Sequence, residues 1–182
     1  MAASMMAVRR RAAAARRPEE SYRRLTGWFT RPSVIDIHLI VDQINYEGVL
    51  IAVEANLEVV RRLLDEGWNQ GRLEVIDELV AEDAVPAHDS PSPGRQSWKD
   101  AIVLYRSAFP DLRYRIDDLF GTDDKVVLRW TATGTDTVGF MGRPPTGRQA
   151  SVTGINIYRL DDGVLVEHWD QWDLAGLIQK LS

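Results

Sequence analysis

The sequence contains no cysteine, which excludes disulfide bonds, thiolate metal sites and cysteine nucleophiles. Its apolar runs are far shorter than the ~18 residues that a membrane-spanning helix needs, so we expect no membrane partner. Glycine-rich nucleotide motifs are also missing, because the loop GRPPTGR has neither the glycine spacing nor the lysine of a phosphate loop. We therefore expect no NAD, FAD or ATP, and a protein that works without a cofactor.

Charge is distributed unevenly along the 182 residues. The chain has 27 acidic and 22 basic side chains and a formal net charge of −5. Residues 1–31 hold eight arginines and only two glutamates, so the remainder of the chain is strongly acidic. An acidic body repels phosphate groups, and we expect no nucleic-acid partner. The length suits one domain of about 100–200 residues with a tail.

The first 18 residues, MAASMMAVRRRAAAARRP, are basic, rich in alanine and free of acidic groups. Three interpretations compete: an organelle transit peptide, a basic arm for an acidic partner, or an extension without a selected role. We favour a non-functional or processed extension, and hence a cytoplasmic protein, with an organelle as the alternative location. Residues 32–52 are apolar but fit no clear period. We expect residues 1–51 to be a poorly ordered extension and residues 52–182 to be the folded domain.

Three amphipathic helices are expected after residue 52, because apolar residues recur there at spacings of three and four. The first has the face Leu57, Val60, Leu64 and Trp68. The second has the face Leu73, Ile76, Leu79 and Val80. The third has the face Trp98, Ile102, Tyr105 and Phe109, with Ser97 as its expected cap and Pro110 as its stop. The proline-rich segment DAVPAHDSPSPG between the second and third helices is expected to be irregular or an edge strand.

From residue 112 onward the period changes to the alternation of strands. Strands are expected at residues 112–120, at VVLRWTATGT, at QASVTGINIYRL and at VLVEHWDQW, with DDG as a hairpin turn between the last two. The segment DLAGLIQKL closes the chain as a short helix capped by Asp173. Helices followed by antiparallel strands predict an α+β domain with helices packed on one face of a curved sheet.

The last strand has an unusual composition. His168, Asp170 and Trp172 point to one face of the strand, and Glu167 and Trp169 point to the other. Each face therefore mixes charged groups with tryptophan, which is typical of a cavity wall. On the preceding strand Gly154, Asn156 and Tyr158 share one face.

Two stretches carry a resemblance to a known family. The segment from GRPPTGRQASVTGINIYRLDDG to VLVEHWDQWDLAGLIQKL resembles the C-terminal half of the SnoaL-like polyketide cyclases, also called ester cyclases. NLEVVRRLLDEGWNQGRLEVIDELVAEDAVPAHD is similar to the paired helices and the following segment of the same family. The resemblance covers about residues 53–182. It implies the cone-shaped fold of nuclear transport factor 2, in which helices and a curved antiparallel sheet enclose a pocket.

The resemblance also implies roles for individual residues. Asp170 matches the family's acid/base on the last strand, with His168 as the preceding histidine. His88 matches a segment that enters the pocket, and Asn156 matches a polar pocket position. Further pocket residues are expected to be Trp172, Phe140, Met141 and Tyr158. Gly154 departs from the family's pattern, which has a polar side chain there, and this departure concerns the substrate.

The leading hypothesis is an acid/base enzyme that closes a ring in a small hydrophobic carbonyl compound by an aldol-type or related enolisation step. The general requirement is a carboxylate that accepts a C–H proton and returns it. The alternatives are a non-catalytic module for ligand binding or dimerisation, and a hydrolase in which a carboxylate activates water. A metal is not expected, because Glu167 and His168 face opposite ways and no HxH or HExxH pair occurs. A homodimer or higher homo-oligomer is expected.

Overall fold

The structure is a computed structural model that describes residues 34–87 and 92–182. The chain divides into two units, residues 1–44 and 45–182, and the second holds the sheet and the core. Residues 1–33 of the expected extension lie outside the described residues, and so does His88. No helix among the described residues is long and apolar enough to cross a membrane.

Helix α3 (Val34–Arg62) continues directly into a π-helical segment, η1 (Leu63–Asn69). The helix therefore begins in the apolar segment that showed no period, and it runs through residue 52. Its buried side follows the expected spacing, because Val60 and Leu64 are fully enclosed. The wider π turn carries the same face forward to Trp68, which is partly buried against the core.

The second expected helix is shorter than its apolar spacing suggests. Helix α4 (Glu74–Leu79) stops before Val80, and strand β1 (Val80–Val85) starts there. This strand lies at the edge of the sheet and pairs in parallel with β5 (Val164–Trp172). The sheet is thus mixed rather than purely antiparallel. The reason is that the two strands lie far apart in the sequence, so no tight hairpin imposes opposite directions on them.

Helix α5 (Gln96–Ala108) presents the expected apolar face to the core. Its start differs from the expectation, because Arg95 occupies the cap position and Ser97 lies inside the first turn. The Ser97 hydroxyl donates to the carbonyl oxygen of Gly94 at 2.8 Å, so it bonds back to the residue before the cap and does not occupy the cap position itself. The backbone leaves the helix at Phe109, directly before Pro110.

The remaining strands follow the alternation in the sequence. They are β2 (Arg113–Gly121), β3 (Lys125–Thr135), β4 (Gln149–Asp161) and β5, which pair antiparallel in the order β2-β3-β4-β5. Asp162 and Gly163 make the tight turn between β4 and β5 with φ of +48° and +77°. Helix α6 (Leu174–Lys180) is capped as expected, because Asp173 accepts a hydrogen bond from the Gly176 amide at 2.8 Å. The α+β prediction is confirmed.

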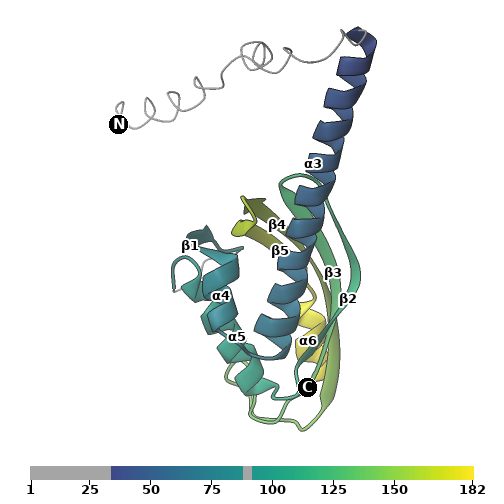
Figure 1. The fold of residues 1–182 in the computed structure, drawn as a ribbon. Coiled ribbons are helices and arrows are strands. Elements are labelled where there is room, and N and C mark those ends of the chain that lie inside the picture. The colour runs from purple at the N-terminus through teal and green to yellow at the C-terminus, as the bar shows by residue number, and fades with distance from the viewer. Residues whose placement is uncertain (1–33, 88–91) are drawn as a thin grey trace, which may run out of the picture. The chain divides into compact units, whose positions relative to one another are not determined.

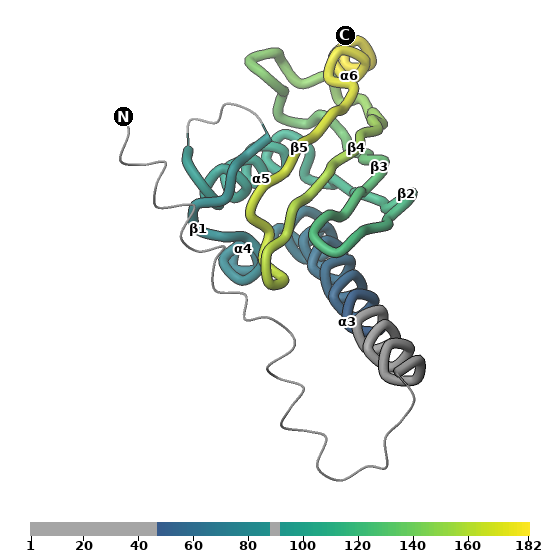
Figure 2. The backbone as a smooth tube through the Cα atoms, turned by 90° about the horizontal axis from the view of Figure 1, so that it is seen from above, coloured from purple at the N-terminus to yellow at the C-terminus, as the bar shows by residue number. Residues whose placement is uncertain are grey.

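The main core lies between the helices and one side of the curved sheet, along which α4, α5 and the C-terminal half of α3 are arranged (Figures 1 and 2). Side chains from both layers are almost completely enclosed there. They are Leu63, Ile76, Ile102, Leu128 and Leu165. Burying side chains of this size contributes about 1.5–3 kcal/mol each relative to exposure, which fixes the helices against the sheet.

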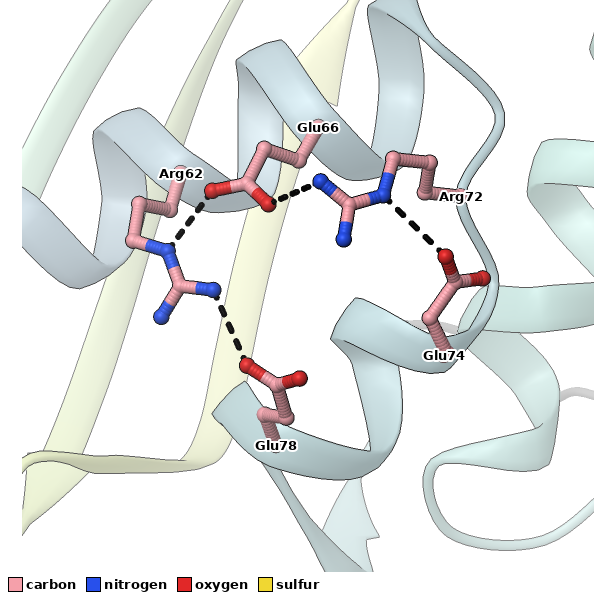
Figure 3. Close-up of polar contacts among 5 residues, drawn as sticks. All are labelled: Arg62, Glu66, Arg72, Glu74 and Glu78. Atoms are coloured by element: carbon pink, nitrogen blue, oxygen red, sulfur yellow. Dashed lines mark hydrogen bonds and ion pairs between the residues drawn. The ribbon is translucent and has the colours of Figure 1, made fainter.

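A chain of ion pairs joins the helical layer on its outer side (Figure 3). Glu66 on η1 accepts from Arg62 at 2.7 Å and from Arg72 at 2.8 Å. Arg62 also reaches Glu78 on α4, and Arg72 reaches Glu74. The hydrogen bond from Arg62 lowers the pKa of Glu66. These ion pairs connect η1 to α4 across the short loop that joins them.

Candidate active site

A cavity of about 760 Å³ lies between η1, α5 and the inner side of strands β3, β4 and β5. This volume falls within the range of small-molecule sites, which is roughly 300–1,000 Å³. Its wall is mostly apolar and aromatic. The main lining side chains are Leu64, Trp68, Trp98, Leu104, Tyr105, Phe109, Tyr114, Trp130, Met141, Val152, Asn156, Tyr158, His168, Asp170 and Trp172. A small number of polar groups thus stand in an otherwise hydrophobic wall.

Strand β5 contributes three of these residues from one face. His168, Asp170 and Trp172 line the cavity. On the opposite face Glu167 accepts from Arg159 at 3.0 Å, and the side chain of Trp169 is 44% exposed. The alternation of the strand therefore separates a cavity face from an outer face, and Asp170 is placed among aromatic rings.

The ring of His168 is held between two aromatic side chains. Its centroid lies 4.5 Å from that of Trp98 on α5 and 5.9 Å from that of Tyr158 on β4, with the tyrosine ring nearly parallel to it. Contact with these two rings restricts rotation of the imidazole. His168 is therefore suited to present a fixed edge to the cavity beside Asp170.

The register of β4 against β5 sets polar groups opposite each other. Asn156 is the direct partner of Asp170, Tyr158 of His168, and Gly154 of Trp172. Directly opposite residues on the same face of a sheet have Cβ atoms about 4.5–5.5 Å apart. Asn156 and Asp170 are thus close enough to contact the same small molecule.

Three tyrosines line the cavity together with Asp170. Burial raises the pKa of Tyr105, Tyr114 and Tyr158, and the negative charge of Asp170 raises each of them further. They come from three elements, α5, β2 and β4. Because their phenols stay protonated at neutral pH, they bring hydroxyl groups, which can donate or accept hydrogen bonds, into an apolar site.

These tyrosines predict an unusual alkaline behaviour. The unfolded chain releases phenolic protons near pH 10, whereas the folded chain retains them. The contribution of these tyrosines to the free energy of unfolding should therefore be constant below about pH 10 and fall as the pH rises above it. We expect a tyrosinate absorbance titration to show part of the five tyrosines ionising late. Tyr158→Phe should remove a portion of the late phase. Ionisation of every tyrosine near pH 10 in the folded protein would contradict this arrangement.

The other expected pocket residues are placed differently. Met141 lines the cavity, whereas Phe140 is buried behind it, with its ring 5.5 Å from Tyr105 and 5.4 Å from Phe109. The cavity is also lined by Trp98, Tyr105 and Trp130, which the sequence pattern does not assign to a site. The helical face of Trp98 and Tyr105 was visible in the sequence, but a buried helix face and a cavity wall share the same pattern.

Metal ligands do not cluster in the described parts of the chain. Within residues 34–87 and 92–182, no three histidine, aspartate or glutamate side chains are grouped so that they could hold an ion. The polar groups of the cavity wall instead include the carboxylates of Asp100 and Asp170, an imidazole, amides and phenols, which suit proton transfer and hydrogen bonding to carbonyl oxygen.

The comparison with protein families decides the relationship. A model of the SnoaL-like polyketide cyclase family matches residues 58–181. The chain belongs to this family. The resemblance seen in the sequence is therefore confirmed, and the fold agrees with the cone of nuclear transport factor 2. No curated protein matches the chain.

Solved structures of similar proteins support the assignment. TsrD from Streptomyces laurentii is 29% identical with a TM-score of 0.67, over 71% of this chain and 96% of that one. IdmH from Streptomyces antibioticus, a proposed polyketide cyclase, is 34% identical with a TM-score of 0.62, over 69% and 97%. AclR from Streptomyces galilaeus, a proposed hydroxylase, is 27% identical with a TM-score of 0.63, over 71% and 96%. The similar structures thus include proteins for which different reactions are proposed.

Proposed function

We propose that this SnoaL-like protein is a cyclase that closes a ring in a small hydrophobic carbonyl compound by acid/base catalysis. The observation that supports it best is the position of Asp170, a carboxylate in the wall of an aromatic cavity, opposite Asn156 and next to His168. An apolar cavity favours substrates of low polarity, and a carboxylate there can accept a proton from an acidic C–H bond.

The reaction proceeds in two steps. In the first, Asp170 takes a proton from a carbon between two carbonyl groups, and the electron pair of that C–H bond becomes an enolate. In the second, the enolate carbon attacks another carbonyl carbon of the same molecule and forms a C–C bond. The oxygen of the attacked carbonyl becomes an alkoxide, which takes the proton back from Asp170. No atom is gained or lost, so the product is an isomer of the substrate.

His168 and the tyrosines support this chemistry. The imidazole of His168 is fixed between Trp98 and Tyr158 and lies two residues from Asp170 on the same strand face, so it contacts a substrate oxygen bound beside the carboxylate. Tyr158 and Trp172 cover the apolar part of the substrate, and Met141 closes the wall near the loop after β3.

The experiment is incubation of the protein with linear aryl esters that carry two or more β-related carbonyl groups, in ordinary and in heavy water. We expect an isomer of unchanged mass in ordinary water and enzyme-dependent deuterium uptake at the acidic carbon in heavy water. An acid and an alcohol whose masses together exceed that of the ester by one water would instead support the hydrolase alternative. A product heavier by one oxygen would support hydroxylation. Binding of the esters without exchange or product would support the non-catalytic module.

The expected homodimer has a candidate surface on the outer side of the sheet. Phe120, Val127, Ile157 and Trp169 are register neighbours across β2, β3, β4 and β5. Phe120 is 60% exposed and Ile157 is 37% exposed. The pairs Arg129–Asp118 and Arg159–Glu167 carry both charge signs beside this row, which fits a second copy of the same surface.

A charge introduced into this row of apolar side chains is expected to dissociate the dimer. Trp169→Glu buries a carboxylate in the proposed contact, so we expect a monomer by sedimentation velocity at concentrations where the wild type is a dimer. Val103→Glu, at an exposed position on α5, is the matched control and should leave the dimer intact. A dimeric Trp169→Glu variant, or a monomeric wild type, would place the contact elsewhere or remove it.

A further inference from the structure

One side-chain hydrogen bond in the cavity wall reaches diagonally across two strands. The indole Nε1 of Trp130 on β3 donates to Oδ1 of Asn156 on β4 at 2.5 Å. The direct register partner of Trp130 is Gly154, and that of Asn156 on β3 is Leu128. The indole therefore extends over Gly154 to reach the residue two positions further along β4.

Gly154 makes this path available. A Cβ atom at this position would lie 2.3 Å from Cζ2 and 2.7 Å from Cε2 of the Trp130 ring, far inside contact distance. Any side chain at this position would thus collide with the indole. The glycine and the tryptophan form one unit, in which the ring occupies the space of the absent side chain and carries an N–H donor to Asn156.

The hydrogen bond determines which way the amide of Asn156 is turned. An indole N–H donates and never accepts, so the atom of Asn156 that faces it must be the carbonyl oxygen. The oxygen and nitrogen of the Asn156 amide are thus assigned by the chemistry of the donor. The amide Nδ2 consequently points away from Trp130, and the direct partner of Asn156 on β5 is Asp170.

We propose that Nδ2 of Asn156 donates a hydrogen bond to the substrate oxygen that becomes negative when Asp170 removes the proton. Trp130 is then the positioning residue, because its indole N–H holds Oδ1 of the amide and leaves Nδ2 for the substrate. The amide has two N–H donors, which suffice for Asp170 and for a substrate oxygen together. This inference rests on the proposed function for the identity of the oxygen, because enolisation places negative charge on it. Donors aimed in advance at such an oxygen stabilise the transition state without reorganisation.

The donor can be tested without knowing the substrate, with p-nitrophenolate as a stand-in for an enolate oxygen. The parent protein is Asp170→Asn, which removes the repelling carboxylate and mimics its protonated form. Phenolate binding is measured by absorbance in four proteins. They are the parent, the parent with Trp130→Phe, the parent with Asn156→Ala, and the parent with both substitutions. Trp169→Phe, at the exposed outer position, is the control for a tryptophan replaced by phenylalanine.

We expect Asn156→Ala to weaken phenolate binding by about 10- to 100-fold, since hydrogen bonds to charged groups are worth that much. Trp130→Phe should weaken it by about 3- to 10-fold, with no further loss when Asn156→Ala is already present, because the indole acts through the amide. If Trp130→Phe weakens phenolate binding as strongly in the presence of Asn156→Ala as in its absence, Trp130 acts by packing, and the proposal is overturned. Unchanged affinity in Asn156→Ala, or no saturable binding to the parent, would overturn it as well.

A spectroscopic measurement keeps the geometry testable if Trp130→Phe folds poorly. The indole N–H resonance of Trp130 should lie downfield in the wild type and shift upfield in Asn156→Ala, which loses the acceptor. An unmoved resonance would refute the hydrogen bond. In turnover, Trp130→Phe should lower kcat and leave KM nearly unchanged. Phenolate binding with the expected losses but without turnover of any carbonyl ester would count against the cyclase and leave the oxyanion donor standing.

Discussion

Asp170→Asn is expected to lower kcat on an accepted carbonyl ester by about 10²- to 10⁴-fold, the usual value of a positioned acid/base. The amide keeps the shape of the carboxyl group but cannot take a proton from carbon. Folding should survive, because Asp170 is only partly buried at the cavity wall and an amide of the same size fits there. The measurement is kcat and KM of the variant, together with its melting temperature.

A matched control separates this effect from a general change of charge. Asp162→Asn alters an aspartate in the exposed turn between β4 and β5, outside the cavity lining, and should leave kcat unchanged. Equal turnover by wild type and Asp170→Asn would remove Asp170 from the mechanism. A variant that no longer folds, from a wild type without activity, would favour a structural carboxylate in a non-catalytic cone.

A simple physical regularity explains why the cavity face of the last strand could be predicted from the sequence. Side chains alternate along a strand, so the spacing of His168, Asp170 and Trp172 alone predicts that they share a face. The short terminal helix and its Asp173 cap were accessible for the same reason, since a cap is a local signal. Local periodicity and local hydrogen bonding are encoded within a few residues, and these elements needed nothing more.

Elements that depend on distant partners were not accessible in this way. The direction of β1 depends on β5, which lies some eighty residues later, and the apolar spacing before it made Val80 look helical. Residues 34–52 form part of a helix without a one-sided apolar pattern, so no periodicity in the sequence predicted this part of the helix. Ser97 has the chemistry of a cap, but the helix starts one residue earlier and its hydroxyl donates instead.

The site itself shows the same division. Tyr105 and Tyr114 line the same cavity as Asp170 from α5 and β2, and only the packing of the helix on the sheet brings them there. The contact of Trp130 with Asn156 depends on the register of β3 against β4, which alternation does not specify. Gly154 was noticed as a departure from the family, and its physical reason appears only once the indole is placed over it.

Gly154→Ala is expected to be the most disruptive single-methyl change in the site. The added Cβ would lie 2.3 Å from the Trp130 ring and 2.8 Å from the Cβ of Trp172, and neither group is the free end of a flexible side chain. Overpacking of this kind costs about 1–3 kcal/mol, which corresponds to a melting temperature lower by roughly 2–12 °C. Displacement of the indole also breaks its hydrogen bond to Asn156, so phenolate affinity should fall with stability.

Two further variants show that the ring is the cause. Thr153→Ala, the adjacent residue on the exposed face of β4, should change neither the melting temperature nor phenolate binding appreciably. Adding Trp130→Phe to Gly154→Ala shortens the ring at the collision, so the double variant should recover part of the lost stability but none of the lost affinity. Recovery of both would mean that the indole only fills space. A Gly154→Ala protein with wild-type stability would mean that the ring does not lie over Gly154, and the orientation of Asn156 would then have to come from another contact.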